Sequence, residues 1–268
     1  PRVRCAIETD LLYPLLRGRD VRRWQATPSA YLILTQDPET RAGIPEATMR
    51  RKYPLTWAYL KRFEPALRQR AVFRKFYRPT DPFYSMYGVG PYTLARSKVV
   101  WPEVGHEVRA SVCSLAPSID GHRVPVPDHT LIGVQCASSD EAFYLAGLLN
   151  AAPARLLVRS YIALHPSPHV LQNLKIRRWG AGVARHQAIA QLSKEAHAKA
   201  AQGRRYAVAE LEREIDRLAA RLWGITRDEL KAIQTALGQE PQVSDAGLIQ
   251  EDSAAYGECP DDQEGEES

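Results

Sequence analysis

The stretch SSDEAFYLAGLLN, residues 138–150, decides the fold, because strand-type sequence precedes it and helix-type sequence follows it. Ser138 and Glu141 have the spacing of a capping box, which predicts a helix over residues 142–150. Pro153 can begin a second short helix that ends near Tyr161, because proline is favoured in the first helical turn. Helices are therefore expected from this stretch onward.

The sequence before residue 138 is richer in strand signals. Residues 71–137 combine short β-branched runs with Pro, Gly and Asp turns, and the clearest strands are residues 98–101 and 130–134. Another strand is predicted at residues 31–35, which end before the turn signal of Asp37 and Pro38. A mixed, mostly β subdomain is expected here.

One helical pattern interrupts this strand-rich part. It begins at Pro54, and Leu60, Phe63 and Leu67 recur at steps of three and four residues. Pro65 should kink or interrupt the helix, because proline lacks the amide proton that an interior helical hydrogen bond needs.

A second helical pattern extends from about residue 187 to Trp223. Its apolar stripe recurs at alternating steps of three and four residues and consists of Val208, Leu211, Ile215, Leu218 and Leu222. Gly224 suits the end of this helix, and Thr226 with Glu229 forms a capping box for a last helix that runs to about Gly238.

These elements predict an α+β fold with three parts. Residues 1–178 form the mixed, mostly β subdomain, residues 179–238 form a helical region, and residues 239–268 form an acidic tail. The tail contains too little apolar sequence to bury, so it is predicted to be disordered.

The charge is distributed unevenly along the chain. Residues 1–239 contain all 36 Lys and Arg but only 21 of the 31 Asp and Glu, so this body carries a charge of +15. The last 29 residues hold the other ten acids and no base. A strongly basic domain of this kind favours a polyanionic partner such as nucleic acid.

Composition also bears on the cellular setting. The longest apolar stretch, residues 142–164, contains Arg155 and Arg159, so no transmembrane helix is predicted. Four cysteines, all expected to be small buried hydrophobes, are scattered without a CxxC pair: Cys5, Cys113, Cys136 and Cys259. A reducing, cytoplasmic location is expected.

The sequence LLRGRDVRRW, residues 15–24, predicts a surface that meets phosphates and bases. It surrounds a glycine with arginines and ends on Trp24, which we expect to be exposed. The residues of this segment that we expect to contact DNA are Arg17, Gly18, Arg19, Asp20, Arg22 and Arg23.

Residues 41–98 supply similar chemistry, with thirteen Lys and Arg against three acids and eleven interleaved aromatic residues. Arginines that only solvate the surface, over a core of aromatic rings, are the alternative explanation for any one residue. For the region as a whole we favour contact with nucleic acid. The candidates from this region are Lys61, Arg62, Arg70, Tyr84, Tyr87 and Lys98.

No motif in the chain predicts catalysis or a metal site. The glycines of YGVGPY, residues 87–92, indicate a turn, since the third glycine of a dinucleotide loop is absent. His165 and His169 are separated by two prolines that rule out a helix, which argues against a metal pair. Glu229 and Lys231 match the ExK of some nucleases but lie in a predicted helix.

Several segments, in this order, resemble the C-terminal target-recognition region of adenine-N6 DNA methyltransferases. They are LLRGRDV (15–21), YLIL (31–34), PLTWAYLKRF (54–63) with LRQR (67–70), ARSKVVWP (95–102), LAGLLN (145–150), IDRL (215–218) and LWGIT (222–226). The resemblance covers about residues 8–237, and the order of the segments is more specific than any one of them.

The resemblance implies that this chain reads duplex sequence for an S-adenosylmethionine-dependent methyltransferase. The family's catalytic domain carries an FxGxG-like loop and an (N/D)PP(Y/F) motif, and neither occurs here. We therefore expect the catalytic domain, with its S-adenosylmethionine, to lie upstream as a partner of this chain, which itself binds no cofactor.

The resemblance also implies roles for individual residues. Arg17 to Asp20 match an "RGKD"-like turn, where arginine could contact phosphate or guanine and glycine would permit close approach of DNA. Lys98 matches the lysine before a strand whose Trp101 is expected in the core. Asn150 matches a helix-ending asparagine whose role is helix termination or contact.

The sequence also allows two other functions. The parent protein could be a bifunctional restriction endonuclease and methyltransferase, with its cleavage residues outside this chain. The chain could instead be a protein-interaction module, in which the helix of residues 187–223 docks on another subunit and the basic face binds an acidic partner.

Overall fold

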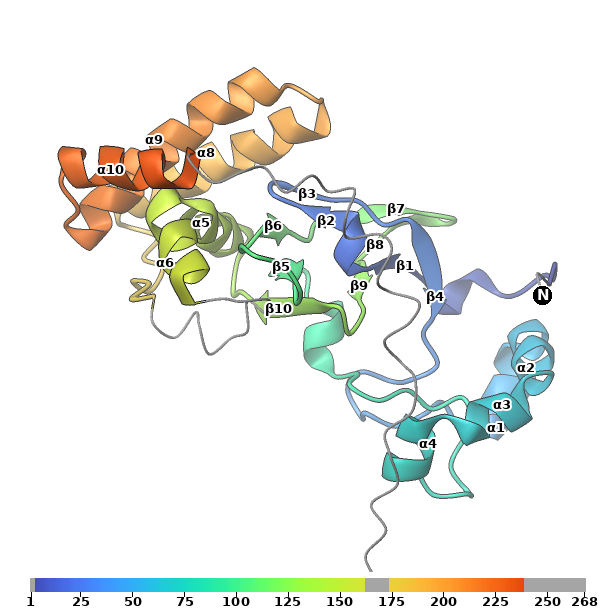
Figure 1. The fold of residues 1–268 in the computed structure, drawn as a ribbon. Coiled ribbons are helices and arrows are strands. Elements are labelled where there is room, and N and C mark those ends of the chain that lie inside the picture. The colour runs from blue at the N-terminus through green and yellow to red at the C-terminus, as the bar shows by residue number, and fades with distance from the viewer. Residues whose placement is uncertain (1–2, 162–173, 239–268) are drawn as a thin grey trace, which may run out of the picture.

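The computed structural model describes residues 3–161 and 174–238 and has a mixed α+β architecture. Figure 1 shows small sheets at the centre, a helical lobe on one side and a group of short helices on the other. The predicted disordered tail, the pair of His165 and His169, and Cys259 lie outside the described residues. The predicted α+β class is confirmed.

The first sheet has the strand order β4-β1-β9. Its central strand β1, Leu12–Leu16, is antiparallel to β4, Ala30–Ile33, and parallel to β9, Val126–Pro127. Burial alternates along β1, as expected for a strand with one face in the core. The strand predicted at residues 31–35 corresponds to β4.

The second sheet has the order β10-β5-β6 and includes the two strands predicted most clearly. Strand β5, Lys98–Pro102, lies between β10, Leu131–Gln135, and β6, Ser111–Val112, and both pairings are antiparallel. All five β5 residues are buried, because Val99 and Trp101 pack under the helical lobe while Val100 packs against the first sheet.

The other strands and the 3-10 helices are short connections around these sheets. Two hairpins pair β2 with β3 and β7 with β8. The bounds are β2 Val21–Arg22, β3 Gln25–Ala26, β7 Ala116–Ser118, β8 Gly121–Arg123, η1 Thr9–Leu11, η2 Gly18–Asp20 and η3 Pro91–Leu94.

Four short helices form a separate lobe, here called the α1–α4 lobe (Figure 1). They are α1 Glu46–Lys52, α2 Pro54–Lys61, α3 Glu64–Gln69 and α4 Ala71–Phe76. Pro65 lies in the first turn of α3, so the predicted interruption of the helix is confirmed. The prediction that residues 71–137 are β-rich is wrong at α4. Met49 and Phe83 fill the core of this lobe.

The helical lobe begins at the stretch from which the fold was predicted. Its helices are α5 Ser139–Asn150, α6 Ala152–Tyr161, α8 Ala184–Ala201, α9 Arg205–Trp223 and α10 Arg227–Gly238. Ser138 Oγ accepts a hydrogen bond from the Glu141 N–H at 3.1 Å, so the predicted N-cap of α5 is confirmed. The carboxylate of Glu141 accepts from the N–H of Ala137, one residue before the expected donor.

The predicted single helix over residues 187–223 is wrong, because the chain reverses direction between α8 and α9 (Figure 1). Gly203 has φ of 70° in the connection, a left-handed conformation that glycine adopts without strain. The predicted apolar stripe of α9 does pack against the main core, and Ile215 is completely buried. Gly224, with φ of 71°, ends α9 as predicted.

The fold bears on the expected absence of a transmembrane helix and on the expected burial of the cysteines. Among the helices of the described residues, none has both the length and the apolarity needed to cross a bilayer. Cys113 and Cys136 are buried and free, as expected, but Cys5 is exposed, so its predicted burial is wrong.

Candidate nucleic-acid interface

The predicted arginine turn forms η2, between β1 and β2, and is braced by its own side chains. The carboxylate of Asp20 accepts a hydrogen bond from the Arg17 N–H at 3.0 Å and lies 3.6 Å from Arg17 Nε. Arg17 Nη2 donates to Ser29 Oγ at 2.9 Å. Arg17 and Asp20 therefore stabilise the turn through their polar groups.

Gly18 is held against the neighbouring loop. Its N–H donates to Thr130 Oγ1 at 2.7 Å, and Thr130 donates in turn to Asp128 Oδ1 at 2.5 Å. A Cβ atom on Gly18 would lie only 3.3 Å from Thr130 Oγ1. The group that approaches Gly18 closely is thus Thr130 of the same protein.

Two arginines of the turn remain available to a ligand. Arg19 and Arg22 are exposed, and neither side chain has a partner among the described residues. Arg23 instead lies 3.1 Å from Glu212 and 3.6 Å from Glu107 in two ion pairs.

The prediction that Trp24 is exposed is wrong. It is 2% exposed, and its φ of 65° turns the ring inward between β2 and β3. Its Nε1–H donates to Glu212 Oε1 at 2.6 Å, and its ring makes an edge contact with His197, with centroids 5.4 Å apart. Glu212 comes from α9, so a distant helix makes this burial possible by accepting the indole hydrogen bond.

Two candidates from residues 41–98 lie in the interior. Lys98 is 3% exposed and donates to the carbonyl oxygen of Thr93 at 2.5 Å, and burial lowers the pKa of its ammonium group. Tyr84 is 2% exposed and donates to the carbonyl oxygen of Ile44 at 2.7 Å. Both side chains support the fold, and we leave them out of the interface.

Arg70 also has a scaffolding position. Its guanidinium donates to the carbonyl oxygens of Phe83 at 3.0 Å and Ser85 at 2.9 Å. These bonds join the end of α3 to the loop that fills the core of the α1–α4 lobe. Arg70 Nε also donates to the Leu67 carbonyl oxygen at 2.9 Å, and burial lowers the pKa of the guanidinium.

Lys61 and Arg62 lie on the surface at the end of α2, with different surroundings. Lys61 forms an ion pair with Glu64 and lies over the Trp57 ring, 5.6 Å from its centroid. Arg62 is exposed and has no side-chain partner among the described residues. Of the two, Arg62 presents the freer charge.

An exposed aromatic pair lies between α4 and the loop that follows it. The rings of Phe76 and Tyr87 stack with centroids 4.2 Å apart and planes 17° from parallel, although they are 47% and 60% exposed. Lys75 Nζ lies 5.4 Å from the centroid of the Phe76 ring. An apolar stack next to a cation is therefore presented to solvent.

The same surface continues through a glycine-containing turn. Tyr92 is 50% exposed, and its hydroxyl donates to the carbonyl oxygen of Gly88 at 2.5 Å. A Cβ atom on Gly90 would lie 2.8 Å from Tyr92 Cε1 and 3.4 Å from Arg41 Nε, so these two side chains meet at this turn. The term aromatic patch is used below for Arg41, Lys75, Phe76, Tyr87 and Tyr92.

Of the patch residues, sequence reasoning selected only Tyr87 as a contact. Phe76 and Tyr92 were recognised within an aromatic-rich region, but nothing in the composition separates them from the buried Phe73 and Phe83. The sequence signal for Tyr87 and Tyr92 is the turn of Gly88 and Gly90 between them, because connecting loops run over the protein surface.

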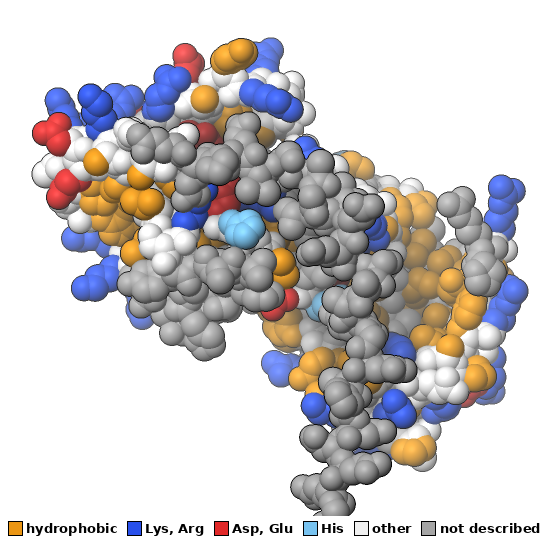
Figure 2. Space-filling view, viewed as in Figure 1, with side chains coloured by type: hydrophobic (Ala, Val, Ile, Leu, Met, Phe, Trp, Pro, Cys, Tyr) orange, Lys and Arg blue, Asp and Glu red, His pale blue; other side chains and the backbone are white. Residues whose placement is uncertain are grey.

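Charge is spread over both lobes on the face seen in Figure 2. Lys and Arg side chains stand along the edges of the helical lobe and of the α1–α4 lobe, and Asp and Glu side chains are fewer. This distribution agrees with the excess of basic over acidic residues in the body of the chain.

The remaining motifs have structural roles. Asn150, 3% exposed, accepts from the Ala110 N–H at 2.9 Å and donates to the Ala110 carbonyl at 2.8 Å, so it anchors a loop. Glu229 accepts from the Thr226 N–H at 2.8 Å, which completes the predicted capping box of α10. Within residues 3–161 and 174–238, no group of three or more His, Cys, Asp or Glu could hold a metal ion.

No protein-family model and no curated protein matches the sequence of this chain. The fold and the surface together define an α+β protein with an exposed aromatic and basic patch.

Proposed function

We propose that this chain recognises a specific sequence in duplex DNA, as the specificity part of a cytoplasmic adenine-N6 DNA methyltransferase of a restriction-modification or phage-defence system. The observation that carries the proposal is the aromatic patch, in which exposed rings lie beside Arg41 and Lys75. The motif order described above supports the choice of methyltransferase. Methyl transfer from S-adenosylmethionine is assigned to a separate catalytic domain.

The chemistry of the patch suits a nucleic acid better than a small apolar ligand. An exposed stack of two rings leaves apolar area in water, and such area commonly marks an interaction surface. The neighbouring cations would bind phosphates, which supply much of the affinity of DNA-binding proteins. Aromatic side chains can then contact sugars, thymine methyl groups or base faces.

The free arginines complete the proposed interface. Arg19 and Arg22 extend from the turn after β1, and Arg62 extends from the end of α2. They can bind phosphates or read guanine edges, because none is engaged by a carboxylate among the described residues.

The test is the binding of duplex DNA, measured by fluorescence anisotropy as salt is raised from about 50 to 200 mM. Several phosphate contacts would give a log-log slope of about 0.9 per contact. Replacing both Arg19 and Arg22 with Gln should reduce the slope by about one per arginine. Tyr87→Leu should weaken binding with the slope unchanged, because tyrosine carries no charge.

Lys231→Gln is the matched control, since it removes one exposed charge from α10, outside the proposed interface. It should leave the slope unchanged. Absence of salt-dependent binding, or equal slopes for all variants, would overturn the proposal. Binding of an acidic protein that DNA does not displace would support the protein-interaction alternative instead.

A further inference from the structure

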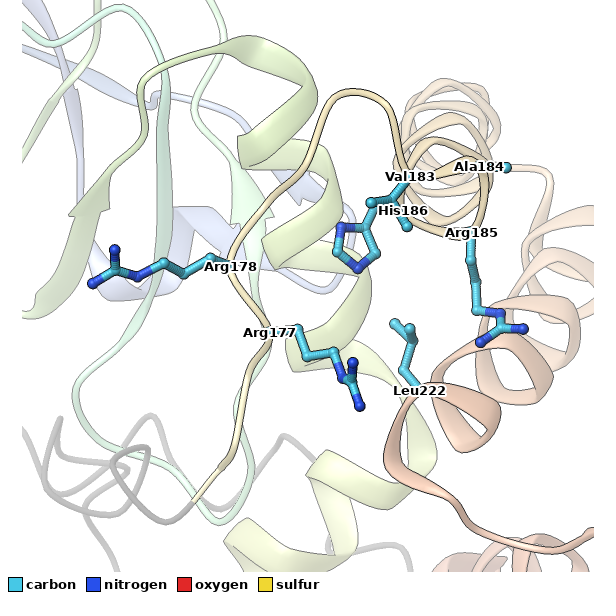
Figure 3. Close-up of a pocket in the computed structure, with 7 residues that line it drawn as sticks. All are labelled: Arg177, Arg178, Val183, Ala184, Arg185, His186 and Leu222. Atoms are coloured by element: carbon cyan, nitrogen blue, oxygen red, sulfur yellow. The ribbon is translucent and has the colours of Figure 1, made fainter.

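A second basic site lies in the helical lobe. A cavity of about 660 Å³ opens where the segment before α8 meets the first turn of that helix and the end of α9 (Figure 3). The side chains that matter are Arg177, Arg185 and His186, with Leu222 forming an apolar wall. Among the residues that the structure describes, no acid lines this cavity.

The two arginines are uncommitted. Arg177 and Arg185 are exposed, and neither guanidinium has a hydrogen bond or ion pair with another described residue. In Figure 3 the side chains of Arg177 and Arg185 lie around Leu222 on the His186 side, and Arg178, which also lines the cavity, extends to the other side of the segment. Two positive charges held near each other without a carboxylate repel, and a bound anion would relieve that repulsion.

His186 directs a ring N–H toward the same cavity. It is 5% exposed, and its ring lies 4.6 Å from that of Tyr144 and 6.2 Å from that of Trp179, measured between centroids. Nδ1 accepts a hydrogen bond from the Gly180 N–H at 3.2 Å, so the ring proton is on Nε2. Nε2 points toward the cavity and has no partner among the described residues (Figure 3).

The charge state of His186 is set by its surroundings. Burial and the nearby Arg177 and Arg185 lower the pKa of the imidazole below its usual range. The ring is therefore a neutral hydrogen-bond donor at neutral pH. Its Nε2–H can donate to an oxygen atom of a ligand in the cavity.

The helix itself contributes to the site. Helix α8 is 18 residues long, has no side-chain N-cap, and has no acid in its first turn. Its first N–H groups lack partners within the helix, and its dipole places partial positive charge at this end. Together with His186 Nε2–H and the two guanidinium groups, these donors converge on one cavity.

We propose that this cavity binds a phosphate group, held by Arg177, Arg185 and His186 Nε2–H at the N-terminus of α8. The phosphate belongs either to a DNA backbone or to a free phosphorylated ligand. The site does not depend on the proposed interface, because it shares no residue with the aromatic patch. Leu222 provides apolar contact for the group that carries the phosphate.

The first experiment titrates the full chain with inorganic phosphate and with pyrophosphate in a calorimeter. Arg177→Gln and Arg185→Gln should each weaken binding by about tenfold, because each removes a charge-assisted hydrogen bond. Arg213→Gln is the matched control, since it removes the same charge from an exposed position of α9 that does not line the cavity. It should change the affinity by less than about threefold.

A second readout excludes unfolding as the cause. The imidazole signals of His186 should shift on addition of pyrophosphate to the wild-type chain and to Arg213→Gln. They should not shift in the double variant Arg177→Gln/Arg185→Gln. No binding by the wild-type chain, or equal losses in all three arginine variants, would overturn the proposal.

Competition identifies the source of the phosphate. If duplex DNA displaces pyrophosphate and the double variant lowers the salt slope of DNA binding, the cavity holds a backbone phosphate. If pyrophosphate binds and DNA does not compete, the ligand is a free phosphorylated molecule. Replacing Arg19 and Arg22 should leave pyrophosphate binding intact, so the two proposals can fail separately.

Discussion

At the scale of single residues, His197 is the clearest case of a side chain fixed by its partners. Its Nε2 accepts from the Val112 N–H at 2.9 Å, so Nδ1 carries the proton and donates to the Ser193 carbonyl at 2.7 Å. The ring also makes edge contacts with Trp24 and Phe143. Burial lowers its pKa to about 4, because this site has no place for a second proton.

The pH dependence of stability follows from that shift. The unfolded chain takes up a proton on His197 below its ordinary pKa of 6.5, while the folded chain resists protonation down to about pH 4. The stabilising contribution is therefore present above pH 6.5 and falls by about 1.4 kcal/mol per pH unit as the pH decreases through that window. Urea unfolding at several pH values measures this slope.

His197→Gln should flatten much of the slope, because glutamine does not titrate. His186, whose pKa is also lowered, accounts for a remaining part in the same direction. The exposed His122 supplies the matched variant, and His122→Gln should retain the wild-type slope. An unchanged slope in His197→Gln would show that the buried imidazole does not control acid stability.

At the scale of elements, the reversal between α8 and α9 depends on one backbone conformation. Gly203→Ala should lower the free energy of unfolding by about 1 kcal/mol or more, because φ of 70° is unfavourable for a residue with a Cβ atom. Gly182→Ala is the control: its Cβ would also meet open space, but its φ is not in the left-handed region. Thermal unfolding should place Gly182→Ala at or above the wild type, and equal melting temperatures for the two variants would contradict the argument.

The helix ends themselves could be predicted from local sequence. Ser138, Gly224 and Thr226 act within one turn of their own positions, so the sequence around each contains the needed information. The α8–α9 reversal was missed because Gly203 sits within a continuous helical pattern, and its φ depends on how the two helices pack.

At the scale of the whole molecule, Glu212 joins the N-terminal turn to the helical lobe. Its carboxylate accepts from Trp24 Nε1 at 2.6 Å and from Arg23 at 3.1 Å, although these residues are 188 and 189 positions away. Glu107 extends the network, because it binds Arg23 and also accepts from Arg155 at 2.8 Å. One acidic side chain thus ties together two distant segments of the chain.

Glu212→Ala should destabilise the protein by about 1.5–3 kcal/mol, since it leaves the Trp24 donor buried and removes a partner of Arg23. Glu214, two residues after Glu212 on α9, forms a surface ion pair with Arg217, and Glu214→Ala should cost less than about 1 kcal/mol. Chemical denaturation compares the two. Similar losses would mean that the network contributes no more than an exposed pair.

The sequence by itself determined the α+β class, the buried strand β5, the break before α3 and the apolar stripe of α9. These features depend on residue spacing and on the backbone preferences of proline and glycine, which act locally. Within β5 the burial of Trp101 was expected, whereas Lys98 was expected to contact DNA and is buried.

Only the tertiary structure decided which polar and aromatic side chains reach solvent. Trp24 and Tyr84 lie in the interior because segments distant in the chain supply their hydrogen-bond acceptors, whereas Phe76 and Tyr87 remain exposed because no described residue packs over them. The cavity around His186 likewise forms where α8 and α9 converge. Such outcomes depend on contacts between residues far apart in the chain, which local composition does not encode.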